Sequence, residues 1–260
     1  MSPKANELSL ASREAILSAK NLLSSLNIRH PDEIEIDLIA THCGAAVTYR
    51  YLSHEEGHLL RVADTGLIVV DERGRRSEKW RFVIAHELGH FICHRNLDQL
   101  QLCTDSNLND WYRSSGHETD ANFFAAELLM PEFLFAPLCD RSRPSIDDVR
   151  ELASIFHTSL TSTAIRLITF SPEPCAVVCS SKGVVDWSFR TPDFAGYVSK
   201  GWRLTDATYA GDLFANKTVE DRQQIIDGAG WGIGRDIYEH SFKLGGFESV
   251  LTMLWHPYDR

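Results

Sequence analysis

Near the start of the chain, apolar residues recur with the spacing of two helices. In the first run, residues 10–26, leucine or isoleucine returns at helical intervals, and the pattern stops near Asn27. The second run is shorter, from Ile34 to His42, and Gly44 ends it. The two runs therefore predict two helices, the second of them short.

Three short strand-like runs follow these helices. They cover residues 47–52, 59–62 and 67–70. Asp64, Thr65 and Gly66 separate the last two and can turn a hairpin. The first half of the chain is therefore predicted to be α+β with a small antiparallel sheet. The run 67–70 could also bind an extended substrate along an edge, although an ordinary core strand has the same pattern.

Two further helices are predicted on either side of a polar stretch. Residues 77–95 have helical periodicity and Ser77 can cap their start, while residues 118–130 form a second helix that stops before Pro131. Residues 96–117 are polar and show neither helical nor strand periodicity, which predicts an exposed loop.

Beyond residue 140 the pattern predicts a helix pair and then strands. Ser145 and Asp148 form a start similar to a capping box, and a second helix is predicted over 160–168. This pair resembles a helix-turn-helix. Pro172 and Pro174 then break the chain. A hairpin is predicted from two strand-like runs, 175–179 and 184–189.

Composition indicates an ordinary globular protein. Of the 260 residues, 43% are hydrophobic, and 36 acidic against 26 basic side chains give a formal charge of −10. This charge repels phosphate, so we do not expect direct nucleic-acid binding. The first twenty residues lack a secretory pattern, no stretch approaches a membrane span, and the six cysteines form no C-x-x-C pair. A cytoplasmic protein with no membrane partner is expected; the sequence does not give its oligomeric state.

The residues that carry chemistry are His86-Glu87-Leu88-Gly89-His90, a match to H-E-x-x-H on a predicted helix. Two histidines four positions apart lie on one helical face, where both can reach one zinc ion at about 2.0 to 2.1 Å. Glu87 can then face a water molecule on the metal. Residue type and spacing thus agree with metal-assisted hydrolysis.

Zinc hydrolases usually use three protein ligands, so a third is needed. His94 lies eight residues after His86, about 12 Å along a straight helix, which is too far for two ligands of one ion. We expect His94 to pack against the site or to support a ligand. The next helix offers three carboxylates, those of Glu118, Asp120 and Glu127.

The motif HELGH followed by E-x-x-A-N-x-F-A-A-E-L-L-M-P at residues 118–131 resembles the ImmA/IrrE family of bacterial metallopeptidases. The resemblance covers about residues 35–170. It implies a zincin-like fold, His86, His90 and Glu118 as zinc ligands, and Glu87 as the catalytic acid/base. It also implies cleavage of a helix-turn-helix repressor, which relieves repression in a stress response or a mobile element.

Helical geometry also favours Glu118, because it shares the inward face with Ala121 and Ala125. Asp120 points elsewhere. Glu127 lies off this face and is predicted to be a solvated or capping carboxylate. Asn122, one turn after Glu118, could orient a ligand histidine, although an ordinary surface position fits the pattern equally well.

The predicted cofactor is Zn²⁺, with Mn²⁺ or Fe²⁺ as possible substitutes. Glu87 would take a proton from the metal-bound water and return it to the leaving amine. Tyr112 and His117 are candidates for stabilising the oxyanion.

Three domains are predicted. Residues 1–140 form the zincin-like metallopeptidase domain, 141–172 the helix-turn-helix-like extension and 173–260 a C-terminal α+β region with a regulatory role. The alternative function is a sensory or DNA-binding regulator that keeps the zincin fold without cleaving anything. The helix pair has a net charge of −1, and this favours packing over groove reading.

Overall fold

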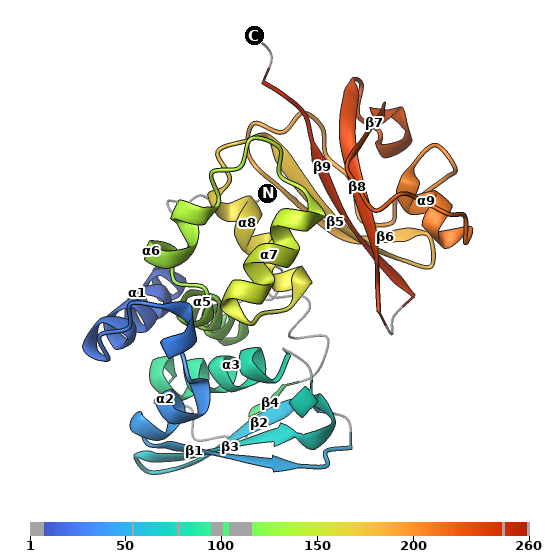
Figure 1. Ribbon diagram of the computed structural model, residues 1–260. Helices are drawn as coiled ribbons and strands as arrows, with labels where there is room; N and C mark the ends of the chain where they lie inside the picture. Colours follow the sequence, from blue (N-terminus) through green and yellow to red (C-terminus); the bar gives the residue numbers. More distant parts are fainter. Residues whose placement is uncertain are drawn as a thin grey trace. The chain divides into compact units, whose positions relative to one another are not determined.

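The computed structural model describes residues 8–53, 55–76, 79–94, 101–103, 116–245 and 248–258, and for residues 75–76 and 101–103 it describes the backbone alone. The chain forms two compact units (Figure 1). The N-terminal unit runs to Phe135 and includes Ile155–Ser159. The C-terminal unit comprises Ala136–Ser154 and the chain from Leu160 onward. The α+β class is confirmed, and the threefold division at residues 140 and 172 remains a prediction.

The N-terminal unit contains the predicted helices. The first ends where Asn27 takes a left-handed conformation with φ 55°, and Gly44 follows the second with φ 91°. Ser77, the predicted cap, lies outside the described residues. The helices are α1 (Leu10–Ser25), α2 (Ile36–His42), α3 (Lys79–Cys93), α5 (His117–Leu129) and α6 (Glu132–Phe135).

The sheet of this unit has the order β1-β3-β2-β4. Its strands are β1 (Ala45–Arg50), β2 (Gly57–Val62), β3 (Thr65–Asp71) and β4 (Gln101–Cys103). β2 and β3 form the predicted antiparallel hairpin, but β1 pairs with β3 in parallel, so the sheet is mixed rather than antiparallel. The reason is that the chain reverses twice between β1 and β3, which restores its direction. Because β3 has a partner on each side, it offers no free edge to a substrate, and the alternative of an ordinary core strand is the correct one.

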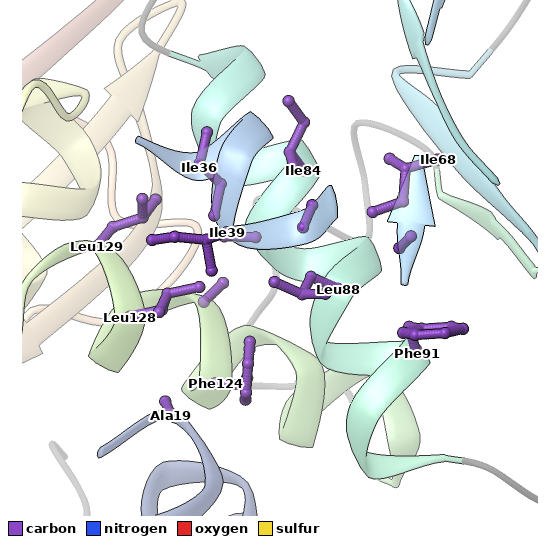
Figure 2. Close-up of a cluster of buried hydrophobic side chains, with 14 of the residues drawn as sticks. Ala19, Ile36, Ile39, Ile68, Ile84, Leu88, Phe91, Phe124, Leu128 and Leu129 are labelled. Carbon is purple, nitrogen blue, oxygen red and sulfur yellow. The ribbon is translucent and has the colours of Figure 1, made fainter. Parts of the chain in front are cut away.

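The core of the N-terminal unit lies between the sheet and the helices. α3 packs on β2 and β3 with one side and on α5 with the other. Figure 2 shows Ile84 and Leu88 of α3 among side chains from α2, α5 and β3. These side chains are fully or almost fully buried. Burial of this many aliphatic groups is the main force that fixes α3 and α5 side by side.

The C-terminal unit contains an antiparallel sheet of order β6-β5-β9-β8-β7. The predicted hairpin is present, and it turns at Lys182 and Gly183, both with positive φ. The elements of the C-terminal unit are α8 (Leu160–Phe170), β5 (Cys175–Ser181), β6 (Val184–Arg190), α9 (Tyr209–Phe214), β7 (Gln224–Asp227), β8 (Asp236–Leu244) and β9 (Ser249–Trp255), with most of α7 (Ile146–Phe156).

The basic side chains of the helix pair α7 and α8 make ion pairs or ring contacts with neighbouring side chains. The backbone N–H of Ser145 donates to Asp148, as the capping pattern predicts, and the Ser145 hydroxyl donates to the same carboxylate oxygen. Arg150 forms ion pairs with Asp147 and Asp221. Arg166 is 7% exposed, and its guanidinium lies 4.6 Å from the centre of the Phe170 ring. These contacts favour packing over groove reading for both arginines.

Two further expectations concern thiols and membrane helices. The five cysteines with described side chains form no disulfide, and burial raises the pKa of Cys139, Cys175 and Cys179 to about 12, so these thiols are inert near neutral pH. No single helix of the described residues is long and apolar enough to cross a membrane. α5 with Glu132–Leu138 meets the length and composition criteria only as a pair bent by 46°.

Candidate metal centre

His86 and His90 lie one turn apart on α3, and both are almost completely buried. Their Nε2 atoms are 3.0 Å apart. This convergence follows from the i, i+4 spacing, because side chains separated by one helical turn lie one above the other on the same face. Burial lowers the pKa of His90, so its imidazole is neutral near pH 7 and can act as a ligand.

Glu118 reaches the two histidines from the first turn of α5. Its Oε2 lies 3.3 Å from His86 Nε2, and its Oε1 lies 3.3 Å from His90 Nε2. Burial acts to raise the pKa of Glu118, but the two imidazole rings beside it outweigh this effect and hold the pKa well below its ordinary value. The carboxylate is therefore ionised. The Glu118 side chain remains 27% exposed whereas both histidines are buried, so Glu118 is the most accessible of the three.

The tautomer of His86 is fixed by a hydrogen bond to α5. Asn122 Oδ1 lies 2.7 Å from His86 Nδ1, and an amide oxygen can only accept, so Nδ1 carries the proton. The Nε2 lone pair of His86 then points toward His90 and Glu118. Asn122 thus has the orienting position that the sequence suggested as one of two possibilities.

Two imidazole nitrogens and an ionised carboxylate fit a divalent cation. Their ligand atoms lie within 4.8 Å of one another. When His90 also carries its proton on Nδ1, the two Nε2 lone pairs face each other 3.0 Å apart beside the carboxylate, and a cation between them offsets the resulting repulsion. Two histidines and one carboxylate with an open side are the ligand set of catalytic zinc sites. The residues present therefore fit the metal that the sequence predicts.

Behind His90 lies a buried row of polar side chains. His94 Nδ1 is 3.0 Å from His90 Nδ1, Asp120 Oδ2 is 3.8 Å from His94 Nε2, and Ser12 donates to Asp120 Oδ1 at 2.7 Å. Burial lowers the pKa of His94 to about 4, so this ring is also neutral. His94 supports a histidine of the centre, as the sequence predicts. Ser12 was not predicted, because it lies 108 positions before Asp120 and no local pattern connects them.

Glu87 is completely buried next to strand β2. A Cβ atom placed on Gly57 would lie 3.8 Å from Glu87 Oε1 and 2.4 Å from Val83 Cγ1. The absence of a side chain at Gly57 thus leaves room for Val83 of α3, while the Glu87 carboxylate lies at ordinary van der Waals distance from this position. Nothing in the sequence around Gly57 signals this role, because β2 and α3 meet only in the folded chain.

The remaining candidates occupy other places. Glu127 is buried rather than solvated, but it does act as a cap, since it accepts a hydrogen bond from the backbone N–H of Glu132 at 3.1 Å. His117 packs its ring on His94, with centroids 4.4 Å apart. Tyr112 lies outside the described residues.

A helix with H-E-x-x-H on a small sheet, and a carboxylate from a second helix, define a zincin-like metallopeptidase domain. Residues 40–167 match the peptidase family described as IrrE N-terminal-like domain. This segment belongs to the ImmA/IrrE family. The match spans the helices that carry His86, His90 and Glu118.

Two known proteins are similar to this chain. The radiation response metalloprotease IrrE of Deinococcus radiodurans is 30% identical over 120 residues, which are 45% of this chain and 35% of that protein. The match thus covers about a third of the curated relative. A Mycobacterium tuberculosis transcriptional regulator of known structure has a TM-score of 0.61 and 18% identity, over 94% of this chain and 76% of that one. The latter similarity shows a common fold.

Proposed function

We propose that this protein is a cytoplasmic, zinc-dependent endopeptidase that cleaves one specific peptide bond in a helix-turn-helix transcriptional repressor. Cleavage would relieve repression in a stress response or a mobile element. The observation that carries the peptidase proposal is the convergence of His86, His90 and Glu118, with Glu87 buried next to them on the same helix. The name of the Deinococcus relative, a radiation response metalloprotease, agrees with it.

In this proposal His86, His90 and Glu118 hold the zinc, which when bound acidifies a water molecule and polarises the peptide carbonyl. Glu87 accepts the proton of the water through its carboxylate. The same carboxylate then delivers the proton to the nitrogen of the leaving amine. Asn122 keeps the proton of His86 on Nδ1, so that Nε2 remains a ligand throughout.

Burial of Glu87 suits this role, because a carboxylate away from bulk water exchanges its proton with the groups placed beside it. Its neighbour Gly57 lies on β2, and a side chain at this position would collide with Val83, one turn before Glu87 on α3. The accessible side of the centre, at Glu118, is where the substrate would approach.

The proposal that the substrate is a repressor is based on the similarity to the ImmA/IrrE family. A narrow metallopeptidase site takes its substrate as an extended segment, so we place the cleaved bond in an exposed loop or interdomain segment rather than in a folded helix. The charge of −10 disfavours strongly acidic targets and DNA. These arguments predict limited cleavage and not general degradation.

The test is incubation of the zinc-loaded protein with the repressor encoded beside it, with casein as a parallel substrate and Glu87→Gln protein as the negative control. One discrete repressor product, absent with Glu87→Gln, is expected. Rapid casein digestion with an intact repressor would overturn the substrate proposal. Failure of the loaded protein to cleave either substrate, together with a response to a ligand or to DNA, would favour a non-catalytic regulator.

A further inference from the structure

A second group of metal-ligating side chains lies beside the candidate metal centre. His94 directly follows α3, and its backbone N–H continues the helical hydrogen bonding to His90 at 3.1 Å. His117 is the first residue of α5, and Asp120 lies one turn further on. One ligand atom from each of these three residues, here called the outer triad, lies within 4.8 Å of the other two.

The carboxylate of Asp120 is held in place for this arrangement. Ser12 on α1 donates to its Oδ1 at 2.7 Å, which leaves Oδ2 facing His94 Nε2 at 3.8 Å. This distance is too long for a hydrogen bond. It is close to the separation of about 3.3 Å between two ligands of one tetrahedral zinc ion with bonds of about 2.05 Å. The side chains of His94 and Asp120 are each only 7% exposed.

His117 supplies the third ligand atom and the side from which a cation can reach the site. Its ring stands edge-on to the ring of His94, with an interplanar angle of 69° and centroids 4.4 Å apart. Unlike the other two members, His117 is exposed, so a cation can enter from its side. The outer triad thus combines two buried ligands with one that faces solvent.

We propose that the outer triad binds a second divalent cation of the zinc type. Two imidazoles and one carboxylate are ligands that zinc accepts, and three protein ligands leave a position for water. Asp120 supplies negative charge to offset that of the cation, and the buried Ser12 hydroxyl keeps its other oxygen occupied. None of these residues is a ligand of the candidate metal centre.

The two sites are coupled through one hydrogen bond. His90 and His94 face each other through their Nδ1 atoms at 3.0 Å, a gap that holds a single proton. When His90 offers Nε2 to the first cation, its Nδ1 keeps that proton and donates it to His94. His94 must then carry its own proton on Nε2, the atom that a cation in the outer triad requires. Occupation of the outer triad therefore weakens binding at the candidate metal centre, and the reverse also holds.

The test uses Co²⁺, whose visible absorption reports a bound site, and the full-length chain. In His86→Ala protein the first centre is disabled, and we expect one Co²⁺ to bind at the outer triad. The further change His117→Ala should weaken this binding at least about tenfold. Removal of a residue that only supports a ligand costs about 10–100-fold in metal affinity, and removal of a direct ligand should cost at least as much. Adding His42→Ala instead, at another exposed histidine of the same unit, should leave binding unchanged.

The double variant His86→Ala/Asp120→Asn should lose binding in the same way, with circular dichroism confirming that each protein is folded. Absence of Co²⁺ binding to folded His86→Ala protein, even in excess metal, would overturn the proposal. Equal binding with and without His117 would do so as well. For the coupling, Co²⁺ should bind at least about tenfold more weakly to wild-type protein loaded with one zinc than to His86→Ala protein; equal affinities contradict it. None of these measurements depends on peptidase activity.

Discussion

Gly89 of α3 lies directly against Ala121 of α5. A Cβ atom at position 89 would come within 3.1 Å of both the Cα and the carbonyl oxygen of Ala121. These are backbone atoms, which cannot move aside as a flexible side chain does. The glycine inside H-E-x-x-H therefore allows the two helices to approach closely, and Glu118, which precedes Ala121 by one turn, reaches His86 and His90 for this reason.

We expect Gly89→Ala to destabilise the protein by about 1–3 kcal/mol, as overpacking of a close helix contact does. An alanine in an open helical position would instead stabilise by about 0.5–1 kcal/mol. Zinc affinity should fall too, because the added methyl group pushes α5, and Glu118 with it, away from His86 and His90. Denaturant unfolding and zinc titration measure both effects. Gly74→Ala, where a Cβ meets no atom within 4 Å, is the matched control, and the same behaviour in both variants would contradict this interpretation.

Removal of a ligand should release the metal. His86→Ala and Glu118→Ala proteins, purified and dialysed, are each expected to lose most of their tightly bound metal, zinc in the first instance, because two remaining ligands hold it weakly. Elemental analysis gives the metal content per chain. Full occupancy in Glu118→Ala protein would transfer the third ligand to another residue, and Asp120 would be examined first.

Glu87→Gln should separate folding and metal binding from catalysis. The amide preserves the shape of the side chain but cannot accept a proton from water, so we expect metal content and stability near those of the wild type and a loss of cleavage of about 10²-fold or more. The repressor assay measures the loss. Glu14→Gln, at an exposed position of α1, controls for the change of charge. Near-normal turnover of the Glu87→Gln variant is incompatible with the assigned role.

Asn122→Ala removes the hydrogen bond that fixes the tautomer of His86. Zinc affinity should fall by about 10–100-fold, the usual effect of losing a supporting partner of a ligand histidine. Asn122→Asp keeps an acceptor oxygen at this place and should restore most of the affinity. If both variants bind zinc like the wild type, the proton on His86 is held by some other group.

Asp71 should contribute to stability in a pH-dependent way. Hydrogen bonds from Arg73 outweigh burial and lower the pKa of this carboxyl. Its contribution is therefore full above the ordinary pKa of 3.8 and lost as the pH falls through the lowered folded-state value. Asp71→Asn should cost roughly 0.5–1 kcal/mol near pH 7, since Arg73 is largely exposed.

Denaturant unfolding at several pH values measures this contribution. The difference between wild type and Asp71→Asn should be constant from pH 7 to pH 5 and shrink toward zero in stronger acid. Asp64→Asn, on the exposed hairpin turn, should show a much smaller difference at every pH. A difference that grows as the pH falls would contradict the assignment to the Asp71 carboxylate.

Features that depend on local physics could be predicted from the amino-acid sequence. The spacing of His86 and His90 places both rings on one helical face wherever the helix packs, and the hairpins follow from short turns between strands. Glu118 could be favoured over Asp120 because it shares a face with the buried alanines of its own helix. The family resemblance rests on the same short segments.

Contacts between segments far apart in the sequence could not be predicted, because they form only when the whole chain folds. Ser12 reaches Asp120 across 108 positions, β1 pairs in parallel with β3, and Gly57 of β2 leaves room for Val83 of α3. Glu127 is buried although its helical position suggested solvent, because neighbouring segments cover that face too. The periodicity of a helix specifies one apolar face. The periodicity does not specify how many other elements pack around the helix, because that depends on how the whole core assembles.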